Sequence, residues 1–350
     1  MPYRVVQWTT GHIGRAAVKG IIRHPDLDLV GAYAWSKEKD GVDVGELCGI
    51  EPLGVVATAD LDTVLGWEPD CVSYMPKRLD VDEMVSLLEA GVNIVSSYFV
   101  NGKMLGDGVR ERLDEAGRRG GATVFGSGIF PGWANFIAPL TATATSEFER
   151  LRFLESVDLT YYEAIANFAQ HGWSAPPDVE TWAPINRIHL GQYEESVEVM
   201  AEMLHVPLDE VTFEYEPAVT PEDRTLNGFL IPAGTVGGQK CTWKGMVGDD
   251  AVIQLEVVWN AGAGLEPEWP LHHGYTMEIT GQPNIRTRMQ FSPSPEQLAS
   301  GRVADLAQPV TAMPCVNAIP AVCEAAPGIR TFADLPLITA RYTPRSSRLS

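Results

Sequence analysis

The segment at residues 3–15, YRVVQWTTGHIGR, constrains the fold of this chain more than any other. Val5 and Val6 lie in a short β-prone run, Gly11 and Gly14 follow with the spacing G-x-x-G, and apolar residues then recur at helical spacing. A strand, a tight glycine turn and a helix in this order either hold a dinucleotide pyrophosphate at the helix N-terminus or form a βα turn without a ligand. We favour the first reading. The predicted phosphate-binding residues are Thr9, Thr10, Gly11, His12, Ile13, Gly14 and Arg15.

Thr9 stands where the usual motif G-x-G-x-x-G has its first glycine. We expect a threonine to support this turn only if its φ stays negative, because positive φ strains a β-branched residue. Its hydroxyl is then a candidate donor to a phosphate oxygen. Gly11 would let the backbone approach the phosphates, and Gly14 would let the helix pack closely on the strand.

The end of the second predicted strand, at residues 26–35, bears on the choice between NAD and NADP. An acidic residue there binds the ribose 2′-hydroxyl of NAD and repels a 2′-phosphate. The sequence instead reads WSKEK at residues 35–39. Ser36, Lys37 and Lys39, with Arg15 placed to reach the same region, favour NADP. The alternative is that the lysines are solvated loop residues, and Glu38 keeps NAD possible.

The composition sets the class of protein. At 350 residues the chain is long enough for two domains, and its formal charge of -20 disfavours nucleic acid or anionic membranes as partners. The five cysteines are scattered and odd in number, which fits reduced thiols in a cytoplasm. We see neither a cationic leader nor an apolar run of the ~18 residues that a membrane span needs.

Strands alternate with helices through the first third of the chain, which predicts an α/β fold with a Rossmann-like doubly wound parallel sheet. Ligands of such sheets lie beyond the carboxyl ends of the strands. Those ends are expected at residues 9–15, 75–76, 96–99 and 126–133, and they should converge. This placement adds Met75, Pro76, Ser96, Ser97 and Tyr98 to the predicted cofactor-binding residues.

From about residue 148 the pattern changes to strands with few helices, which predicts an α+β domain with a mostly antiparallel sheet. Residues 194–204 read as the one clear helix, and residues 163–187 as a long loop over the active site. Residues 316–325 read as a short apolar helix that returns to the first domain. We therefore expect a dinucleotide-binding domain at 1–135, a substrate and dimerisation domain at 136–310, and the returning segment at 311–340.

The motifs together resemble the dihydrodipicolinate-reductase-like group that contains 2,4-diaminopentanoate dehydrogenase and the native amine dehydrogenases. The resemblance rests on VVQWTTGHIGR at 5–15, GAYAWSKEK at 31–39, PKRLD at 76–80, GSGIFPG at 126–132, AGTVGGQ at 233–239 and, most specifically, NAIPAVCEAAPGIRT at 317–331. It implies a dihydrodipicolinate-reductase-like fold, NAD(P), a homodimer, and hydride transfer at a carbon that bears nitrogen or oxygen. Asn317, which opens the last string, is a predicted cofactor contact.

The sequence departs from this family at Thr9 and at the residue that handles nitrogen. The amine dehydrogenases carry a glutamate after the strand equivalent to residues 92–97, in a motif like T-T-x-x-E. Here the matching residues, SSYFVN at 96–101, contain no carboxylate, and the next one is Asp107. The H-H-x-x-x-K motif of the diaminopimelate-pathway reductase is also absent. Reductive amination with ammonia is therefore not the expected native reaction.

A reductase needs a proton donor beside the nicotinamide. The predicted catalytic residues are Tyr98, His171 and Tyr162, with Tyr161 and Glu163 as further candidates. Phe130, Trp133, Phe168 and Trp173, together with Trp182, would line an apolar pocket with Asn135 as a polar contact, or else form core between the domains. Such a pocket suits a hydrophobic or cyclic substrate. No metal site is apparent.

Two functions of different class remain. The first is an NADP-dependent oxidoreductase that reduces C=O, C=N or activated C=C bonds, with amine dehydrogenase as its variant. The second is a dinucleotide-binding sensor without hydride chemistry. The missing glutamate favours the sensor, whereas the aromatic residues and the C-terminal string favour the enzyme.

Overall fold

The computed structural model describes residues 1–160, 162, 164–299 and 306–342, and these form two compact units. Unit 1 comprises Met1–Trp133 and the segment from Ala307 onward, and unit 2 comprises Ala134–Leu306. Tyr161, Glu163 and the tail from Thr343 lie outside the described residues. None of the helices in the described part of the chain has the length and apolar character that a membrane span requires.

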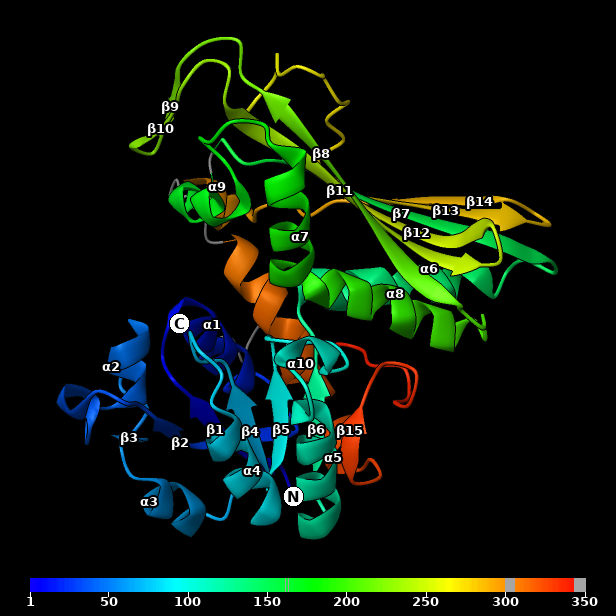
Figure 1. Cartoon of the computed structure of the whole chain (residues 1–350). Coiled ribbons are helices and arrows are strands. Elements are labelled where there is room, and N and C mark those ends of the chain that lie inside the picture. Colours follow the sequence, from blue (N-terminus) through cyan, green and yellow to red (C-terminus); the bar gives the residue numbers. More distant parts are fainter. Residues whose placement is uncertain (161, 163, 300–305, 343–350) are drawn as a thin grey trace. The chain divides into compact units, whose positions relative to one another are not determined.

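Unit 1 contains a seven-stranded parallel sheet with the order β15-β6-β5-β4-β1-β2-β3. The chain runs outward from β1 in one direction to β3 and then in the other direction through β4 to β6, so the topological switch point lies between β1 and β4. The predicted doubly wound sheet is confirmed (Figure 1). The strands are β1 Tyr3–Trp8, β2 Leu27–Tyr33, β3 Ala57–Thr58, β4 Cys71–Tyr74, β5 Asn93–Ser96, β6 Thr123–Gly126 and β15 Gly328–Arg330.

Two buried clusters cover the two faces of this sheet. One face packs against α1, α2 and α10 through residues such as Val18, Cys48 and Ile319. The other packs against α3, α4 and α5 through residues such as Leu87 and Leu113. Both faces of a parallel sheet need such cover, because its strands are apolar on both sides. The helices are α1 His12–Ile21, α2 Val44–Cys48, α3 Leu61–Gly66, α4 Val81–Glu89, α5 Val109–Gly120 and α10 Ala307–Cys323.

The C-terminal segment completes unit 1. The predicted short helix is the longer α10, which continues through Pro314 and Pro320 and packs on α1, β4, β5 and β6. After α10 the chain adds β15 beside β6, a strand that the sequence did not predict. β15 has only three residues, which is too short to show a period. The first and last parts of the chain thus share one hydrophobic core.

Unit 2 contains a six-stranded sheet with the order β14-β13-β7-β12-β11-β8. Four of its pairs are antiparallel and β7–β12 is parallel, so the predicted mostly antiparallel sheet is found. Helices α6 Ala134–Ala142 and α8 Gly191–Met203 pack on it. The strands are β7 Phe148–Asp158, β8 Glu210–Val219, β11 Val236–Val247, β12 Asp250–Asn260, β13 Gly274–Gly281 and β14 Ile285–Met289. A separate hairpin pairs β9 Arg224–Leu226 with β10 Phe229–Ile231.

The prediction of a long loop at residues 163–187 is wrong for most of that segment. The segment holds the 3₁₀ helix η4 Ile165–His171 and most of α7 Val179–His189. Asp178 caps α7, because its carboxylate accepts a hydrogen bond from the backbone N–H of Thr181. Pro184 lies inside α7, and together with the prolines at 176 and 177 it hid the helical pattern in the sequence.

Candidate active site

The turn between β1 and α1 leaves open space at Gly11. Gly11 is the N-cap residue of α1 and has extended backbone, with φ -71° and ψ -173°. Any residue can adopt this conformation, and no described atom lies within 4 Å of a Cβ built there. Neither backbone conformation nor packing within the chain requires glycine at this position. The N–H groups of the first turn of α1 are at the same place, and such groups bind anions.

Thr9 has φ +69°, so the expectation of a negative φ is wrong. Two hydrogen bonds anchor it in this strained conformation: its N–H donates to Tyr33 O at 2.8 Å, and its hydroxyl donates to Met75 O at 3.1 Å. The hydroxyl thus holds the turn to the end of β4, and its proton is directed to Met75 O rather than into the space beside Gly11. Positive φ in a β-branched residue costs roughly 1–3 kcal/mol and is typical of functional turns.

Position 14 needs glycine for the close packing of helix on strand that the sequence predicts, because a Cβ there would collide with Thr9 O. The buried Gln7 fixes the same carbonyl, since its Nε2 donates to Thr9 O at 3.1 Å and to Ser73 O at 3.1 Å. The strained turn and the close approach of α1 to β1 are therefore two parts of one arrangement.

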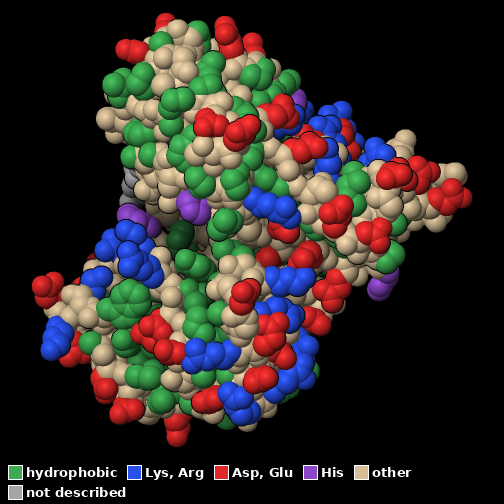
Figure 2. Space-filling model, in the orientation of Figure 1, with side chains coloured by type: hydrophobic (Ala, Val, Ile, Leu, Met, Phe, Trp, Pro, Cys, Tyr) green, Lys and Arg blue, Asp and Glu red, His purple; other side chains and the backbone are tan. Residues whose placement is uncertain are grey.

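Cations surround this turn in a chain of net charge -20. Arg15 Nε donates to Thr10 O at 3.1 Å, and Lys39 Nζ lies 3.4 Å from Thr10 Oγ1. Burial raises the pKa of the nearby Cys48 thiol, while Arg15 and Lys19 lower it. Figure 2 shows acidic and basic side chains interspersed over the visible face. The basic residues at the turn are thus a local feature that the net charge does not predict.

The other predicted cofactor residues lie in unit 1 as well, mostly where strands end. Ser36 donates to Glu38 at 3.4 Å, and Lys37 is exposed. Ser96 is buried, its carbonyl accepts from the N–H of Ser127 at 2.9 Å, and its Oγ accepts from the N–H of Tyr98 at 3.3 Å. The remaining predicted contacts are His12 and Ile13 at the start of α1, Met75 and Pro76 after β4, Ser97 after β5, and Asn317 in α10.

Sequence reasoning missed an aromatic group around Glu83 at the same strand ends. Trp8 stacks on Tyr33 with ring centroids 3.9 Å apart, and Trp8 Nε1 and Tyr74 OH both donate to Glu83 Oε2, at 3.2 and 2.9 Å. Burial raises the pKa of Glu83, and the hydrogen bond from Tyr74 lowers it. Trp8 and Tyr74 each end a β-prone run, which was the available signal.

Several residues predicted for catalysis and substrate binding gather in unit 2. The ring of Phe168 lies 4.9 Å from Trp173, 5.9 Å from His171 and 5.9 Å from Tyr162, centroid to centroid, and Trp259 completes the group at 5.2 Å. We call these five residues the aromatic cluster. Tyr98, Phe130 and Trp133 belong to unit 1, whereas the buried Asn135 belongs to α6 of unit 2.

Trp173 is a core residue, which corrects its predicted place in a pocket wall. Its side chain is 1% exposed, and its indole donates to Gln239 Oε1 at 2.9 Å. Ile165, Ile231 and Val236 are buried with it. Tyr162, in contrast, is 42% exposed, and Phe168 is half-buried, so these two rings form the accessible side of the aromatic cluster.

His171 is buried and hydrogen-bonded, although its sequence suggested a loop. Its Nδ1 lies 3.0 Å from Asn186 Oδ1, and its Nε2 lies 3.3 Å from Gln170 Nε2. Burial lowers the pKa of the imidazole below 6.5, the hydrogen bond to Asn186 raises it, and His189 lowers it. The neutral ring is therefore the resting form near neutral pH.

Glu155 is a buried carboxyl that the sequence analysis did not select. It lies in β7, and Trp259 Nε1 donates to its Oε2 at 3.0 Å. Burial raises its pKa to about 8, while hydrogen bonds with the uncharged Trp259 and Tyr275 lower it. A carboxyl whose pKa is strongly raised and which bonds to the aromatic cluster is a candidate functional group. The alternative is that Glu155 is a purely structural residue of the core.

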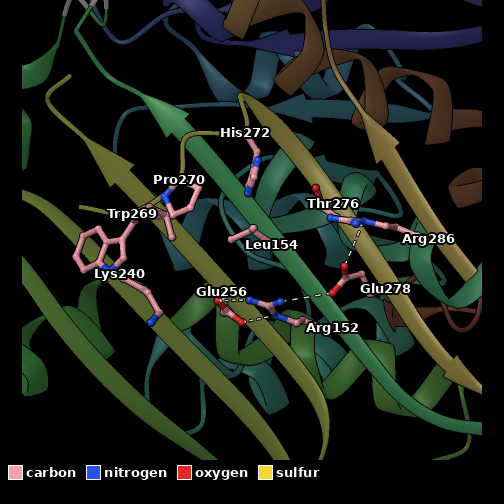
Figure 3. Close-up of a pocket in the computed structure, with 11 residues that line it drawn as sticks. Arg152, Leu154, Lys240, Glu256, Trp269, Pro270, His272, Thr276, Glu278 and Arg286 are labelled. Atoms are coloured by element: carbon pink, nitrogen blue, oxygen red, sulfur yellow. Dashed lines mark hydrogen bonds and ion pairs between the residues drawn. The ribbon is translucent and has the colours of Figure 1, made fainter. Parts of the chain in front are cut away.

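The opposite face of the unit 2 sheet carries a shallow polar pocket of about 220 Å³. Arg152 forms two hydrogen bonds with Glu256, at 2.6 and 3.0 Å, and lies 3.4 Å from Glu278 (Figure 3). None of the predicted site residues lines it. In the described part of the chain no group of three His, Cys, Asp or Glu side chains could hold a metal ion.

Comparisons with known proteins follow the two units. Residues 5–95 match the N-terminal domain of dihydrodipicolinate reductase, and residues 186–348 match the 2,4-diaminopentanoate dehydrogenase C-terminal domain. An amine dehydrogenase of Streptomyces virginiae is 27% identical over 95% of this chain and 96% of its own. A 2,4-diaminopentanoate dehydrogenase of Acetoanaerobium sticklandii is 24% identical over 74% of this chain and 71% of its own.

The fold has a close counterpart among solved structures. An amine dehydrogenase from Mycobacterium smegmatis, 21% identical, matches with a TM-score of 0.67 and covers 97% of this chain and 98% of its own. The prediction of an oxidoreductase is confirmed, because the relatives from Streptomyces virginiae and Acetoanaerobium sticklandii are dehydrogenases. The two matched domains and the two relatives confirm the resemblance of the chain to the dihydrodipicolinate-reductase-like group that contains 2,4-diaminopentanoate dehydrogenase and the amine dehydrogenases.

Proposed function

We propose that the protein is an NAD(P)H-dependent oxidoreductase whose dinucleotide phosphates bind at the turn between β1 and α1. The observation that carries this proposal is Gly11, where an ordinary backbone conformation and open space would accept a larger residue. A bound pyrophosphate supplies the missing reason for glycine, because its oxygens would occupy the position of a Cβ. When bound, the dinucleotide supplies hydride to the substrate or accepts it.

The experiment compares Gly11→Val with Gly66→Val. Gly66 ends α3, and no described atom lies within 4 Å of its Cβ either, so both substitutions should leave the fold intact. We expect Gly11→Val to lower NADPH affinity at least tenfold in a fluorescence-quenching titration, and Gly66→Val to leave it unchanged. Wild-type affinity in a folded Gly11→Val variant would place the phosphates elsewhere.

NADP is the proposed cofactor. Lys39 and Arg15 lie beside Thr10, and Ser36 and Lys37 follow β2, where NAD-binding proteins carry an acid. Titrations with NADPH and NADH test this preference, and tighter binding of NADH would contradict it.

The proposed reaction is hydride transfer to a C=O, C=N or activated C=C bond of a hydrophobic small molecule. Tyr98, His171 and Tyr162 are the proposed proton-handling residues, and Phe130, Trp133, Asn135 and Phe168 the proposed substrate contacts. Turnover of ketones, enones and imines with NADPH tests this proposal. NADPH binding without turnover on any of these classes would favour a sensor.

Reductive amination is the second candidate, because the amine dehydrogenase of Streptomyces virginiae aligns over nearly the whole chain. It needs a base, since ammonia near neutral pH is mostly ammonium. Residues 96–101 offer no carboxylate. We expect ketones to give mainly alcohol at pH 8–9 with ammonium present. Amine formed at a comparable rate would establish the second candidate.

A homodimer in a reducing cytoplasm completes the proposal. The family resemblance supports the dimer. All five cysteines are unbridged, which supports a reducing compartment. Light scattering of the purified protein tests the dimer, and a monomer mass at micromolar concentration would contradict it.

A further inference from the structure

The orientation of the Asn186 side chain is fixed by the groups around it. Asn186 is fully buried in α7, and its Nδ2 donates to His171 O at 3.1 Å and to Trp182 O at 3.0 Å. A reversed amide would place Oδ1 against both of these carbonyl oxygens and would leave buried groups unpaired, at a cost of about 1–3 kcal/mol each. Oδ1 is therefore the atom that faces the imidazole, 3.0 Å from His171 Nδ1.

This orientation determines the tautomer of His171. An amide oxygen only accepts, so Nδ1 must carry the proton, and in the neutral ring Nε2 then presents a lone pair. The partner of Nε2 is the amide Nε2 of Gln170, 3.3 Å away. Gln170 is exposed, so a ligand that offers its own N–H or O–H can replace it.

We infer that His171 Nε2 is the acceptor for a hydrogen bond and a proton from the substrate, with Asn186 as its positioning residue. The substrate then carries N–H or O–H on the carbon that exchanges hydride, so the reaction interconverts an amine and an imine or an alcohol and a carbonyl. This inference rests on the proposed function, and it reverses the donor role that the sequence suggested for resting His171.

The step balances without a further reactant. In the oxidative direction, the carbon loses hydride to the oxidised dinucleotide, the C–N or C–O single bond becomes double, and the proton from nitrogen or oxygen passes to Nε2. Substrate loses two electrons and the dinucleotide gains them. Phe168 and Trp259, with ring centroids 5.9 and 6.5 Å from His171, give the substituents of that carbon an apolar environment.

A second histidine lies beside His171 and lowers the pKa of its ring, and a buried carboxyl contacts the neighbouring Trp259. His189 of α7 lies 5.6 Å away, ring to ring, and Glu155 of β7 lies behind Trp259 and bonds to its indole. Variants of Asn186 leave both groups in place, so comparing such variants with the wild type isolates the contact between Asn186 and His171.

The test uses the full chain and begins with ¹⁵N NMR of the histidine rings, assigned with His171→Asn. We expect a proton on Nδ1 and none on Nε2 of His171 at pH 8. Asn186→Asp places a carboxylate at Nδ1 and should raise the titration midpoint of His171 by about 1–2 pH units, both in the spectrum and in the pH profile of kcat/KM. Gln170→Ala is the matched control and should preserve the tautomer.

Kinetics use NADP-dependent oxidation of cyclohexylamine and cyclohexanol. Asn186→Leu should lower kcat/KM by about 10²–10⁴-fold for the substrate that turns over, with NADPH affinity unchanged. A proton on Nε2 of His171 in the wild type at pH 8 overturns the inference even if Asn186→Leu fails to fold. A wild type that binds no NADPH would instead contradict the proposed function, and the NMR result would still decide the tautomer.

Discussion

Replacing Glu155 with glutamine should make the protein more stable, and increasingly so as the pH rises. The native state keeps a proton on this buried carboxyl up to a pKa of about 8, whereas the unfolded chain loses it near the ordinary value of 4.5. The raised pKa contributes stability that is complete below pH 4.5 and is lost progressively as the pH rises towards 8. Glutamine is neutral at every pH, so the Glu155→Gln variant does not lose this stability as the pH rises.

The magnitude follows from these two pKa values. Each pH unit above 4.5 costs the wild type about 1.4 kcal/mol of unfolding free energy until the native carboxyl ionises. The loss is therefore about 3 kcal/mol at pH 7 and approaches about 5 kcal/mol above pH 8. The glutamine oxygen can still accept from Trp259 Nε1, which lies 3.0 Å from the carboxylate in the wild type. The added N–H₂ group changes the unfolding free energy by the same amount at every pH. The prediction therefore concerns how the difference in unfolding free energy between variant and wild type changes with pH.

The assay is urea-induced unfolding monitored by fluorescence at several values between pH 5 and pH 8.5. The difference between Glu155→Gln and wild type should grow by about 3–5 kcal/mol over this range. Glu149→Gln is the control, because Glu149 lies in the same strand with its side chain exposed, and its pH dependence should parallel the wild type. Parallel curves for Glu155→Gln as well would mean that Glu155 is ionised in the native state, and would refute the reasoning.

Substitutions at three further positions test the turn, the cofactor contact and the core. Thr9→Gly should be more stable than Thr9→Val by roughly 1–3 kcal/mol in urea unfolding, because both lose the bond to Met75 O and only glycine relieves the positive φ; equal stability would argue against strain. Lys39→Glu should weaken NADPH by about 1–3 kcal/mol and NADH much less, and an equal loss for both would contradict a 2′-phosphate contact. Ile319→Ala should destabilise the protein by about 2–5 kcal/mol, since Ile319 is fully buried, whereas Leu298→Ala should not, since Leu298 is 59% exposed; similar losses would contradict this placement of α10.

Periodicity and local signals predicted most of the fold. Apolar spacing after Gly11 gave α1, and the alternation of strands and helices gave the parallel sheet. These features depend on neighbours in sequence. The φ of Thr9 depends on Tyr33 and Met75, at the ends of two other strands, and no local pattern reports such anchors.

The candidate site was less predictable because burial decides the chemistry of its groups. Trp173 and His171 look alike in sequence as loop residues, and packing makes one a core residue and the other a buried, hydrogen-bonded imidazole. Glu155 did leave a signal. Leu151, Phe153 and Val157 lie at every second position with Glu155 along β7, so the four side chains share one face of the strand. This spacing predicts that the carboxyl of Glu155 faces the core. A period-2 reading of charged residues within strands would have found it.

The discontinuity of unit 1 has a consequence for its synthesis. The ribosome completes Met1–Trp133 long before Ala307, because residues 134–306 come between. At about 5–20 residues per second, the wait is roughly 10–35 s. During that time the surface of α1 that α10 later covers, where Gly20 lies against Met313 and Val316, has no permanent partner. The nascent chain therefore exposes an apolar surface throughout this interval. In the cell we expect a chaperone to bind this surface until α10 is synthesised.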